Sequence, residues 1–144
     1  MRKGIKVSVV MPAYNEEERL ETCFLRVLDV LKDYGESFEV ILEEDGSKDG
    51  TPWIIDKLAE SYPFVKALHF PRRMGKGFGV RRCFEIASGE YIVLIDSDME
   101  YPSEEIPTLL GEVDGNDIVV GSRSIWKNKK GGGVKAFRAL LSPL

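Results

Sequence analysis

Short apolar runs alternate with amphipathic segments along this chain. The runs are rich in β-branched residues and predict strands, whereas apolar residues three and four apart between the runs predict helices. The predicted strands span residues 6–11, 38–42, 65–70, 91–95 and 117–120. The predicted helices cover residues near 17–33, a segment that opens at 51 and 52, a segment through 80–87, and residues 102–110. This alternation predicts an α/β domain with a mostly parallel sheet and helices on both faces.

Local signals place the ends of several elements. Pro12 is expected to end the first strand, and Asn15 to cap the helix that follows, where acidic residues in the first turn suit the helix dipole. Thr51 as the cap and Pro52 at the first helical position predict the start of the second helix. Residues 91–95 (YIVLI) form the most hydrophobic run, so we expect this strand at the centre of the sheet.

Composition adds two constraints. With 144 residues, 43% of them hydrophobic and 31% charged, the chain has the size and composition of one soluble globular domain. Its charge is divided unevenly, because residues 1–122 carry 14 Lys and Arg against all 24 Asp and Glu, whereas residues 123–144 carry six basic residues and no acid. A basic segment of this kind either meets an anionic partner, such as a phosphate or a lipid headgroup, or is simply solvated.

The location of the protein is also constrained by what the sequence lacks. No run approaches the roughly 20 apolar residues of a membrane span, and the amino-terminal run is too short for a signal peptide. Cys23 and Cys83 stand in no ligand or redox spacing, which favours buried thiols in a reducing compartment. We therefore expect the protein in the cytoplasm or on the cytoplasmic face of a membrane. The sequence stops inside an apolar-faced helix, so we expect the natural chain to continue past residue 144.

Polar side chains gather where the predicted strands end. Ligands of an open parallel sheet bind at the carboxyl ends of its strands. The polar residues that follow the first four strands are, in order, Tyr14, Asn15 and Glu16; Glu43, Glu44 and Asp45; Arg72, Arg73 and Lys76; and Asp96, Asp98 and Glu100. Carboxylates from three strands would repel one another unless cations or donors are bound between them.

The acids after the fourth strand have the spacing of a metal site. In an extended segment alternate residues point the same way, so Asp96, Asp98 and Glu100 can present oxygens to one cation. Oxygen ligands suit Mg²⁺ or Mn²⁺, which would also hold the two phosphates of a nucleotide. The simpler alternative is a charged loop in which Ser103 or Glu104 caps the next helix.

Other sequence features give weaker evidence for a binding site or exclude particular types of enzyme. The glycine-rich segment 75–79 has neither P-loop nor dinucleotide spacing, but it can form a backbone nest with Lys76 near a phosphate, or a loop without a ligand. His69 is the single histidine and receives no functional role. No Ser-His-Asp, Cys-His or zinc spacing is present, and the segment PAYNEEE after the first strand excludes a haloacid-dehalogenase-type phosphatase.

Five ordered segments resemble glycosyltransferase family 2, which has the GT-A fold, a Rossmann-like α/β sheet. They are PAYNEEE after the first strand, EEDGSKDGT after the second, GKGFGVR before the third helix, IDSDMEYP after the fourth strand, and IVVGSR near residue 123. The resemblance covers about residues 5–124 and is greatest to dolichyl- or polyprenyl-phosphate mannosyl- and glucosyltransferases. Two positions differ: Glu44 stands where the family usually has aspartate, and Glu100 where these enzymes often have glutamine.

The resemblance implies a role for each matching position. Residues expected at the nucleoside are Pro12, Tyr14 and Glu16, with Asp45 on the base edge and Glu43 beside it. Residues expected at the ribose and diphosphate are Asp96, Ser97 and Asp98, with Arg123 at the phosphates or the sugar; Lys76 is expected near a phosphate from the glycine-rich segment alone. Asp96, Asp98 and Glu100 are expected to bind Mg²⁺ or Mn²⁺, and Asp98 and Arg123 to act in catalysis.

The resemblance implies an inverting, metal-dependent enzyme that moves mannose or glucose from a GDP- or UDP-sugar to a polyprenyl or dolichyl phosphate. Two alternatives stay open: transfer to a saccharide or protein hydroxyl, and a nucleotide-sugar-binding module without transfer. We expect residues 1–124 to form the nucleotide-sugar-binding domain and residues 125–144 a basic amphipathic tail that begins an acceptor region and can meet a membrane surface. No nucleic-acid partner is expected.

Overall fold

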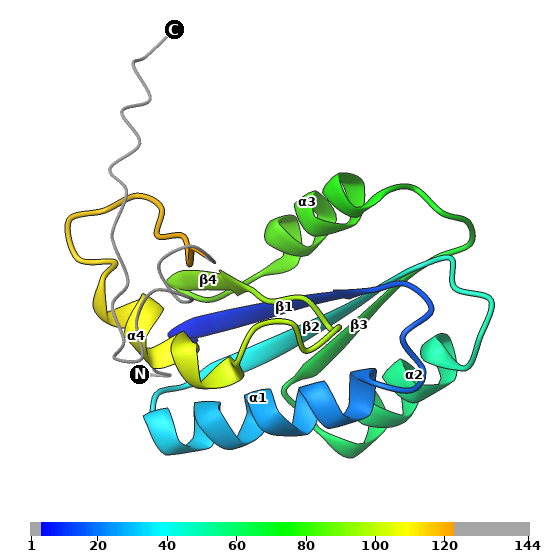
Figure 1. Cartoon of the computed structure of the whole chain (residues 1–144), viewed down its shortest axis with the longest axis horizontal. Coiled ribbons are helices and arrows are strands. Elements are labelled where there is room, and N and C mark those ends of the chain that lie inside the picture. The colour runs from blue at the N-terminus through cyan, green and yellow to red at the C-terminus, as the bar shows by residue number, and fades with distance from the viewer. Residues whose placement is uncertain (1–3, 123–144) are drawn as a thin grey trace, which may run out of the picture. The chain divides into compact units, whose positions relative to one another are not determined.

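A computed structural model describes residues 4–122 of the chain (Figure 1). The chain divides into two compact units, Met1–Ser103 and Glu104–Leu144. The strands of the first unit are β1 (Val7–Ala13), β2 (Phe38–Asp45), β3 (Val65–Phe70) and β4 (Tyr91–Leu94). Its α-helices are α1 (Leu20–Tyr34), α2 (Thr51–Ser61) and α3 (Lys76–Ile86).

The four strands form one parallel sheet in the order β3-β2-β1-β4. Helices α1 and α2 cover one face of this sheet and α3 covers the other (Figure 1). All seven residues of β1 are buried, as expected for a strand covered on both faces. The predicted α/β class, the parallel sheet and the helices on both faces are therefore confirmed.

Helix α1 shows how the sequence pattern directs packing. The five apolar residues that predicted this helix are all buried in it: Leu20, Phe24, Val27, Leu28 and Leu31. The helix ends at Tyr34 and is followed by Gly35, whose φ of 80° is a left-handed conformation that glycine adopts without strain. The predicted start is wrong, however, because the helix begins at Leu20 and Asn15 lies outside it with φ 52°.

Strands β1 and β2 are longer than predicted. Pro12 lies inside β1, and Glu43, Glu44 and Asp45 lie inside β2. Val10 directs its backbone toward β4, since its carbonyl accepts a hydrogen bond from Ile95 N–H. The backbone of Pro12, two residues further along, also faces the β4 side. Pairing with β4 ends at Val10, so no ladder hydrogen bond is lost because proline has no N–H.

Strand β4 lies at an edge of the described sheet, so the prediction of a central position is wrong. Ile92 and Leu94 are 39% and 46% exposed, which shows that a hydrophobic run does not by itself locate a strand within a sheet. Residues 117–120 form no strand in the structure, and Ile118 and Val120 are exposed, so the last predicted strand is also wrong.

Two predicted caps differ from the structure. Thr51 is the first residue of α2, not its cap, and Gly50 precedes it.

A 3₁₀ turn (Ser103–Glu105) leads into α4 (Ile106–Gly111), close to the predicted helix. The residue before α4 is Glu105, which makes no side-chain cap, and Ser103 Oγ is buried without a hydrogen-bond partner. The charged-loop alternative for Ser103 and Glu104 thus gains no support.

Within residues 4–122 none of the helices has the length and apolar character needed to cross a bilayer. The predicted tail, residues 125–144, and Arg123 lie outside the described residues, so the predicted boundary at residue 124 stays a prediction.

Candidate functional site

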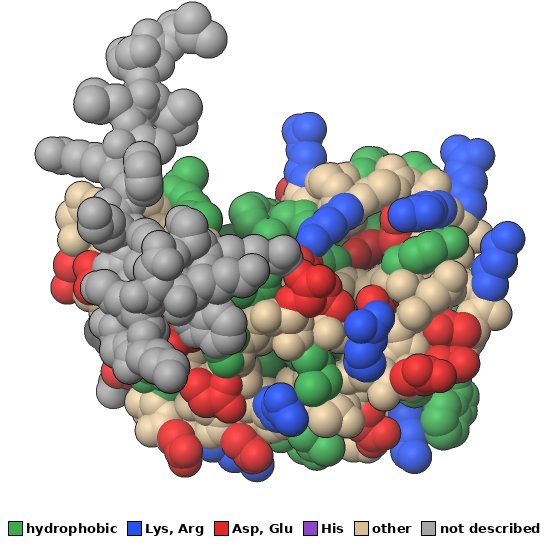
Figure 2. Space-filling view, in the orientation of Figure 1, with side chains coloured by type: hydrophobic (Ala, Val, Ile, Leu, Met, Phe, Trp, Pro, Cys, Tyr) green, Lys and Arg blue, Asp and Glu red, His purple; other side chains and the backbone are tan. Residues whose placement is uncertain are grey.

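A pocket of about 210 Å³ opens at the carboxyl ends of the strands in the first unit. Eleven residues line it: Pro12, Ala13, Tyr14, Glu16, Glu43, Asp45, Arg73, Lys76, Asp96, Ser97 and Asp98. Nine of these are predicted site residues, and acidic and basic side chains gather close together on the face drawn in Figure 2. The strand-end rule therefore located the pocket correctly.

Three parts of the sheet supply the pocket wall. The end of β1 and the residue after it contribute Pro12 and Tyr14, and the last part of β2 contributes Glu43 and Asp45. The segment after β4 contributes Asp96, Ser97 and Asp98, while Arg73 and Lys76 come from the loop after β3 and from the start of α3. Five carboxyl groups and two cations thus face one small volume.

Glu43 is the most unusual residue of this wall. Its side chain is 1% exposed, and its Oε1 has no hydrogen-bond partner. Burial, and then the negative charges of Asp45 and Glu44, raise the pKa of Glu43 to about 7. The carboxyl group also lies close to α3, because a Cβ on Gly79 would lie 2.5 Å from the carboxyl carbon of Glu43, and a larger residue there would require that carboxyl group to shift. An unpartnered buried carboxyl group in a pocket wall points to a ligand that supplies the missing partner.

Asp45 organises the loop that follows β3. Its Oδ1 accepts a hydrogen bond from Met74 N–H at 2.6 Å, and its Oδ2 accepts one from Gly75 N–H at 3.0 Å. Gly46 has φ 69°, and a Cβ there would overlap the backbone of Arg72. Asp45 is therefore used to hold the 72–75 loop against β2. Each carboxylate oxygen keeps a second lone pair, so the predicted bond to a base edge remains a prediction.

Arg73, which follows β3, lines the pocket but is not among the predicted site residues. Its guanidinium lies over the ring of Tyr14, 4.2 Å from the ring centroid, and both residues line the pocket. A cation–π contact of this kind fixes two amphipathic side chains at the pocket mouth. The signal in the sequence was the basic pair Arg72 and Arg73 at a strand end.

The segment Asp96-Ser97-Asp98, the D-x-D segment, is anchored by contacts with β1 and α1. Ser97 donates its hydroxyl hydrogen to the Pro12 carbonyl at 2.9 Å, and the Cys23 thiol lies 3.7 Å from the Asp96 carbonyl. This places Asp96 and Asp98 in the pocket wall, where Lys76 Nζ pairs with Asp96 Oδ1. Ser97 is 2% exposed, so it acts mainly as the anchor of the two acids.

The carboxylates of the pocket can serve as ligands of a divalent cation that binds together with phosphate groups. Within residues 4–122, no group of three or more His, Cys, Asp or Glu side chains is arranged to hold a metal ion. Magnesium is commonly held by one or two carboxylates plus substrate phosphate oxygens, and Asp96 and Asp98 supply two such carboxylates. Glu100 is not part of the pocket lining, and its N–H donates to Asp98 Oδ1 at 2.9 Å, so its role as a metal ligand stays a prediction.

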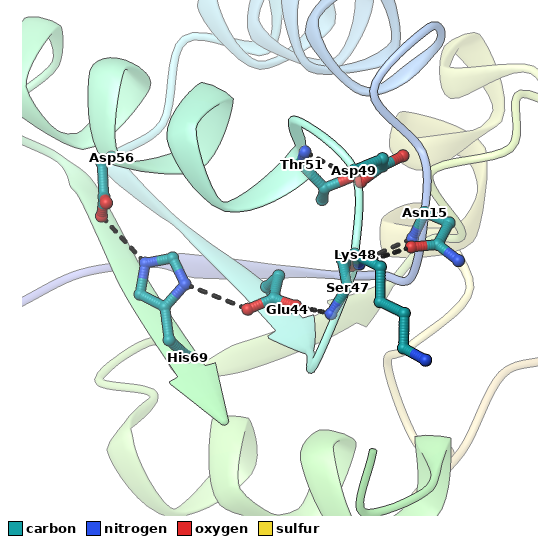
Figure 3. Close-up of polar contacts among 8 residues, drawn as sticks. All are labelled: Asn15, Glu44, Ser47, Lys48, Asp49, Thr51, Asp56 and His69. Atoms are coloured by element: carbon teal, nitrogen blue, oxygen red, sulfur yellow. Dashed lines mark hydrogen bonds and ion pairs between the residues drawn. The ribbon is translucent and has the colours of Figure 1, made fainter. Parts of the chain in front are cut away.

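A polar network joins α2 and the end of β3 to the loops that follow β1 and β2 (Figure 3). His69 Nε2 lies 2.8 Å from Asp56 Oδ1, and its Nδ1 lies 3.3 Å from Glu44 Oε2. The other oxygen of Glu44 accepts a hydrogen bond from Ser47 N–H, and Ser47 Oγ accepts one from Asn15 N–H at 3.0 Å. His69 therefore has a structural place that links α2 and β3 to the 45–50 loop and to the chain after β1.

We expect Glu44→Ala to lower the free energy of unfolding by about 1–3 kcal/mol, because the partly buried Ser47 N–H and the His69 ring would both lose an acceptor. Urea unfolding followed by circular dichroism measures this. Glu60→Ala, on an exposed part of α2, is the matched control and should change the value by less than about 0.5 kcal/mol. Equal effects of the two substitutions would show that the network contributes nothing.

Comparison with known proteins gives a family match over most of the chain. Residues 8–140 match the model of "Glycosyl transferase family 2". The dolichol-phosphate mannosyltransferase of Pyrococcus furiosus is 37% identical over 96% of this chain, and a prophage bactoprenol glucosyl transferase homolog of Escherichia coli is 38% identical over 83%. The chain spans only 38% and 40% of the lengths of these two relatives.

The fold is also found among solved structures. The mannosyltransferase PcManGT of Pyrobaculum calidifontis, solved in complex with GDP-Man and Mn²⁺, aligns with a TM-score of 0.57 and 27% identity. The alignment covers 72% of this chain and 30% of that protein. The GT-A type of α/β fold expected from the sequence is thereby confirmed.

Proposed function

Because the chain belongs to glycosyl transferase family 2, we propose that its pocket binds a nucleoside-diphosphate hexose and that the protein transfers the hexose to a polyprenyl or dolichyl phosphate. One observation carries the proposal: Asp96, Asp98 and the unpartnered carboxyl group of Glu43 meet in one pocket at the strand ends. The names of two relatives, a dolichol-phosphate mannosyltransferase and a bactoprenol glucosyl transferase homolog, support the choice of acceptor.

The donor is proposed to lie with its nucleoside against the ends of β1 and β2. Tyr14, held under the Arg73 guanidinium, offers a flat surface beside which a base can lie, with Pro12 and Glu16 at its border. Asp45 and Glu43 stand where hydrogen bonds to the base edge are possible. Both guanine and uracil carry N–H donors for such bonds, so the donor is a GDP- or a UDP-hexose.

The diphosphate is proposed to lie at the ends of β4 and α3. Lys76 lines this side of the pocket together with Asp96 and Asp98. A divalent cation, Mg²⁺ or Mn²⁺, would be held there by the two aspartates and would neutralise charge on the departing diphosphate. The Mn²⁺ in the PcManGT complex supports this choice. Arg123, outside the described residues, is proposed to contact the phosphates or the hexose.

The proposed transfer is a single in-line displacement. An anionic oxygen of the acceptor phosphate attacks the anomeric carbon on the face opposite the diphosphate. As the new C–O bond forms, the bond between that carbon and the diphosphate oxygen breaks, and its electron pair leaves with the nucleoside diphosphate. The anomeric configuration is inverted. No proton has to be removed from a phosphate that is already ionised, so this acceptor requires no general base.

The basic segment beyond residue 122 is proposed to approach anionic lipid, which would place the reaction at the cytoplasmic face of a membrane. Flotation with anionic liposomes tests this. Replacing five cationic residues with glutamine should weaken binding, and unchanged binding would contradict the proposal; the five are Lys127, Lys129, Lys130, Lys135 and Arg138.

The activity is tested by transfer of labelled hexose from GDP-mannose and from UDP-glucose to a short polyprenyl phosphate. We expect label in the organic extract with Mn²⁺ or Mg²⁺ and none with EDTA. Label on a saccharide or protein hydroxyl, and none on lipid, would contradict the proposed acceptor. Nucleotide binding without transfer to any acceptor would identify a binding module.

A further inference from the structure

A lysine and an aspartate from different elements meet at the pocket. Lys76 is the first residue of α3, and its Nζ pairs with Oδ1 of Asp96, which follows β4. The two side chains are 59% and 35% exposed, so water and solutes reach the pair. An ion pair in contact with water contributes little to the free energy of folding. Either partner can therefore exchange the other for a stronger ligand.

The charges of the pocket make this pair distinctive. Of the two cations that line the pocket, Arg73 lies over the Tyr14 ring, whereas Lys76 pairs with a carboxylate of the D-x-D segment. Asp45 is satisfied by backbone N–H groups instead. In the described pocket lining, Lys76 thus supplies the positive charge at the carboxylate where a divalent cation is proposed to bind.

We propose that Lys76 is an exchangeable counter-ion of the donor site. Its ammonium group holds the Asp96 carboxylate before ligands bind, and it moves to the diphosphate when a divalent cation takes its place at that carboxylate. The inference rests on the proposed function, and it adds that the lysine opposes binding of the cation alone but favours binding of the cation together with the nucleotide.

The surroundings of Lys76 allow such a movement. A Cβ added at either neighbouring glycine, Gly75 or Gly77, would meet no atom within 4 Å, so there is open space beside the first turn of α3. The lysine side chain is a flexible four-carbon stem with three rotatable hydrogen-bond donors. It can change its acceptor without a change in the helix.

Lys76→Met separates the two effects, because it removes the charge and keeps most of the side-chain volume. We expect the affinity for Mn²⁺ alone to rise about fivefold to tenfold, since a positive charge next to the cation's carboxylate is gone. We expect the affinity for GDP or UDP in saturating Mn²⁺ to fall about tenfold, since the diphosphate loses the ammonium group. Lys76→Arg, which keeps the charge, should show neither the gain nor the full loss.

The experiment measures free Mn²⁺ by electron paramagnetic resonance, and nucleotide binding by calorimetry, for the wild type and both variants. Lys32→Met, which removes an equal charge in the last turn of α1, is the matched control and should leave both affinities unchanged. Opposite changes in Lys76→Met support the inference. An unchanged or weaker affinity for Mn²⁺ alone overturns it, even where the nucleotide affinity falls. Failure of the wild type to bind either nucleotide with Mn²⁺ would instead contradict the proposed function.

Discussion

Replacing Asp98 with asparagine is expected to weaken the Mn²⁺-dependent binding of a nucleoside diphosphate by about 100-fold. Asp98 and Asp96 are the two carboxylates of the D-x-D segment in the pocket wall, and Asp96 is already paired with Lys76. Asparagine keeps the size of the side chain and an oxygen that can accept the Glu100 N–H, but it removes the charge that a divalent cation requires. The local fold should therefore persist while binding is lost.

Calorimetry with GDP and UDP in excess Mn²⁺ measures this effect. Asp33→Asn, on the exposed side of α1, is the matched control and should bind like the wild type. In EDTA the wild type and Asp98→Asn should bind equally weakly. If Asp98→Asn retained full affinity in Mn²⁺, the cation would not be held by this carboxylate.

Glu43→Gln is expected to stabilise the protein at pH 8 by about 2–3 kcal/mol and to have little effect near pH 5. The folded protein raises the pKa of Glu43 from 4.5 to about 7, so the protonated form is the one that the fold favours. The stability that the protonated Glu43 side chain contributes to the fold is fully present below pH 4.5 and is lost as the pH rises to about 7. Above pH 7 the fold must hold a buried charge without a partner, and glutamine removes that cost.

Glu39→Gln is the matched control for this prediction, because Glu39 is a buried glutamate on the same face of the same strand. Burial raises the pKa of Glu39, but contacts with Lys66, Ser8 and Ser88 outweigh burial and hold the pKa below its usual value. Its substitution should therefore destabilise the protein at pH 8. Chemical denaturation at pH 5 and pH 8 measures both variants. An increase in the free energy of unfolding of Glu43→Gln that is equal at these two pH values would contradict the raised pKa of Glu43.

The sequence predicted the elements that depend on periodicity. The apolar spacing of α1 identified its buried face, and the polar residues near the strand ends identified the pocket, because both follow from backbone geometry. The same reasoning misplaced the end of β2. The strand is predicted to end at Leu42, where the apolar run ends, yet Glu43, Glu44 and Asp45 continue it because hydrogen bonds or burial accommodate each of them.

Other features depend on contacts between distant residues and could not be predicted from local pattern. The position of β4 at the edge of the described sheet is set by pairing, not by its hydrophobicity. The contact of Arg73 with Tyr14 joins the loop after β3 to the loop after β1. The close approach of Glu43 to Gly79 brings β2 next to α3. Asn15 failed as a helix cap because its side chain accepts a hydrogen bond from Lys48 N–H in another loop.

The central claim is that the strand-end pocket binds a nucleoside diphosphate together with a divalent cation. Calorimetric titration of the protein with GDP and with UDP, each in Mn²⁺, Mg²⁺ or EDTA, tests it most directly. We predict saturable binding of one of the two nucleotides that requires the cation and that identifies the base of the donor. Absence of binding of both nucleotides in every condition, by a protein shown to be folded, would contradict the claim.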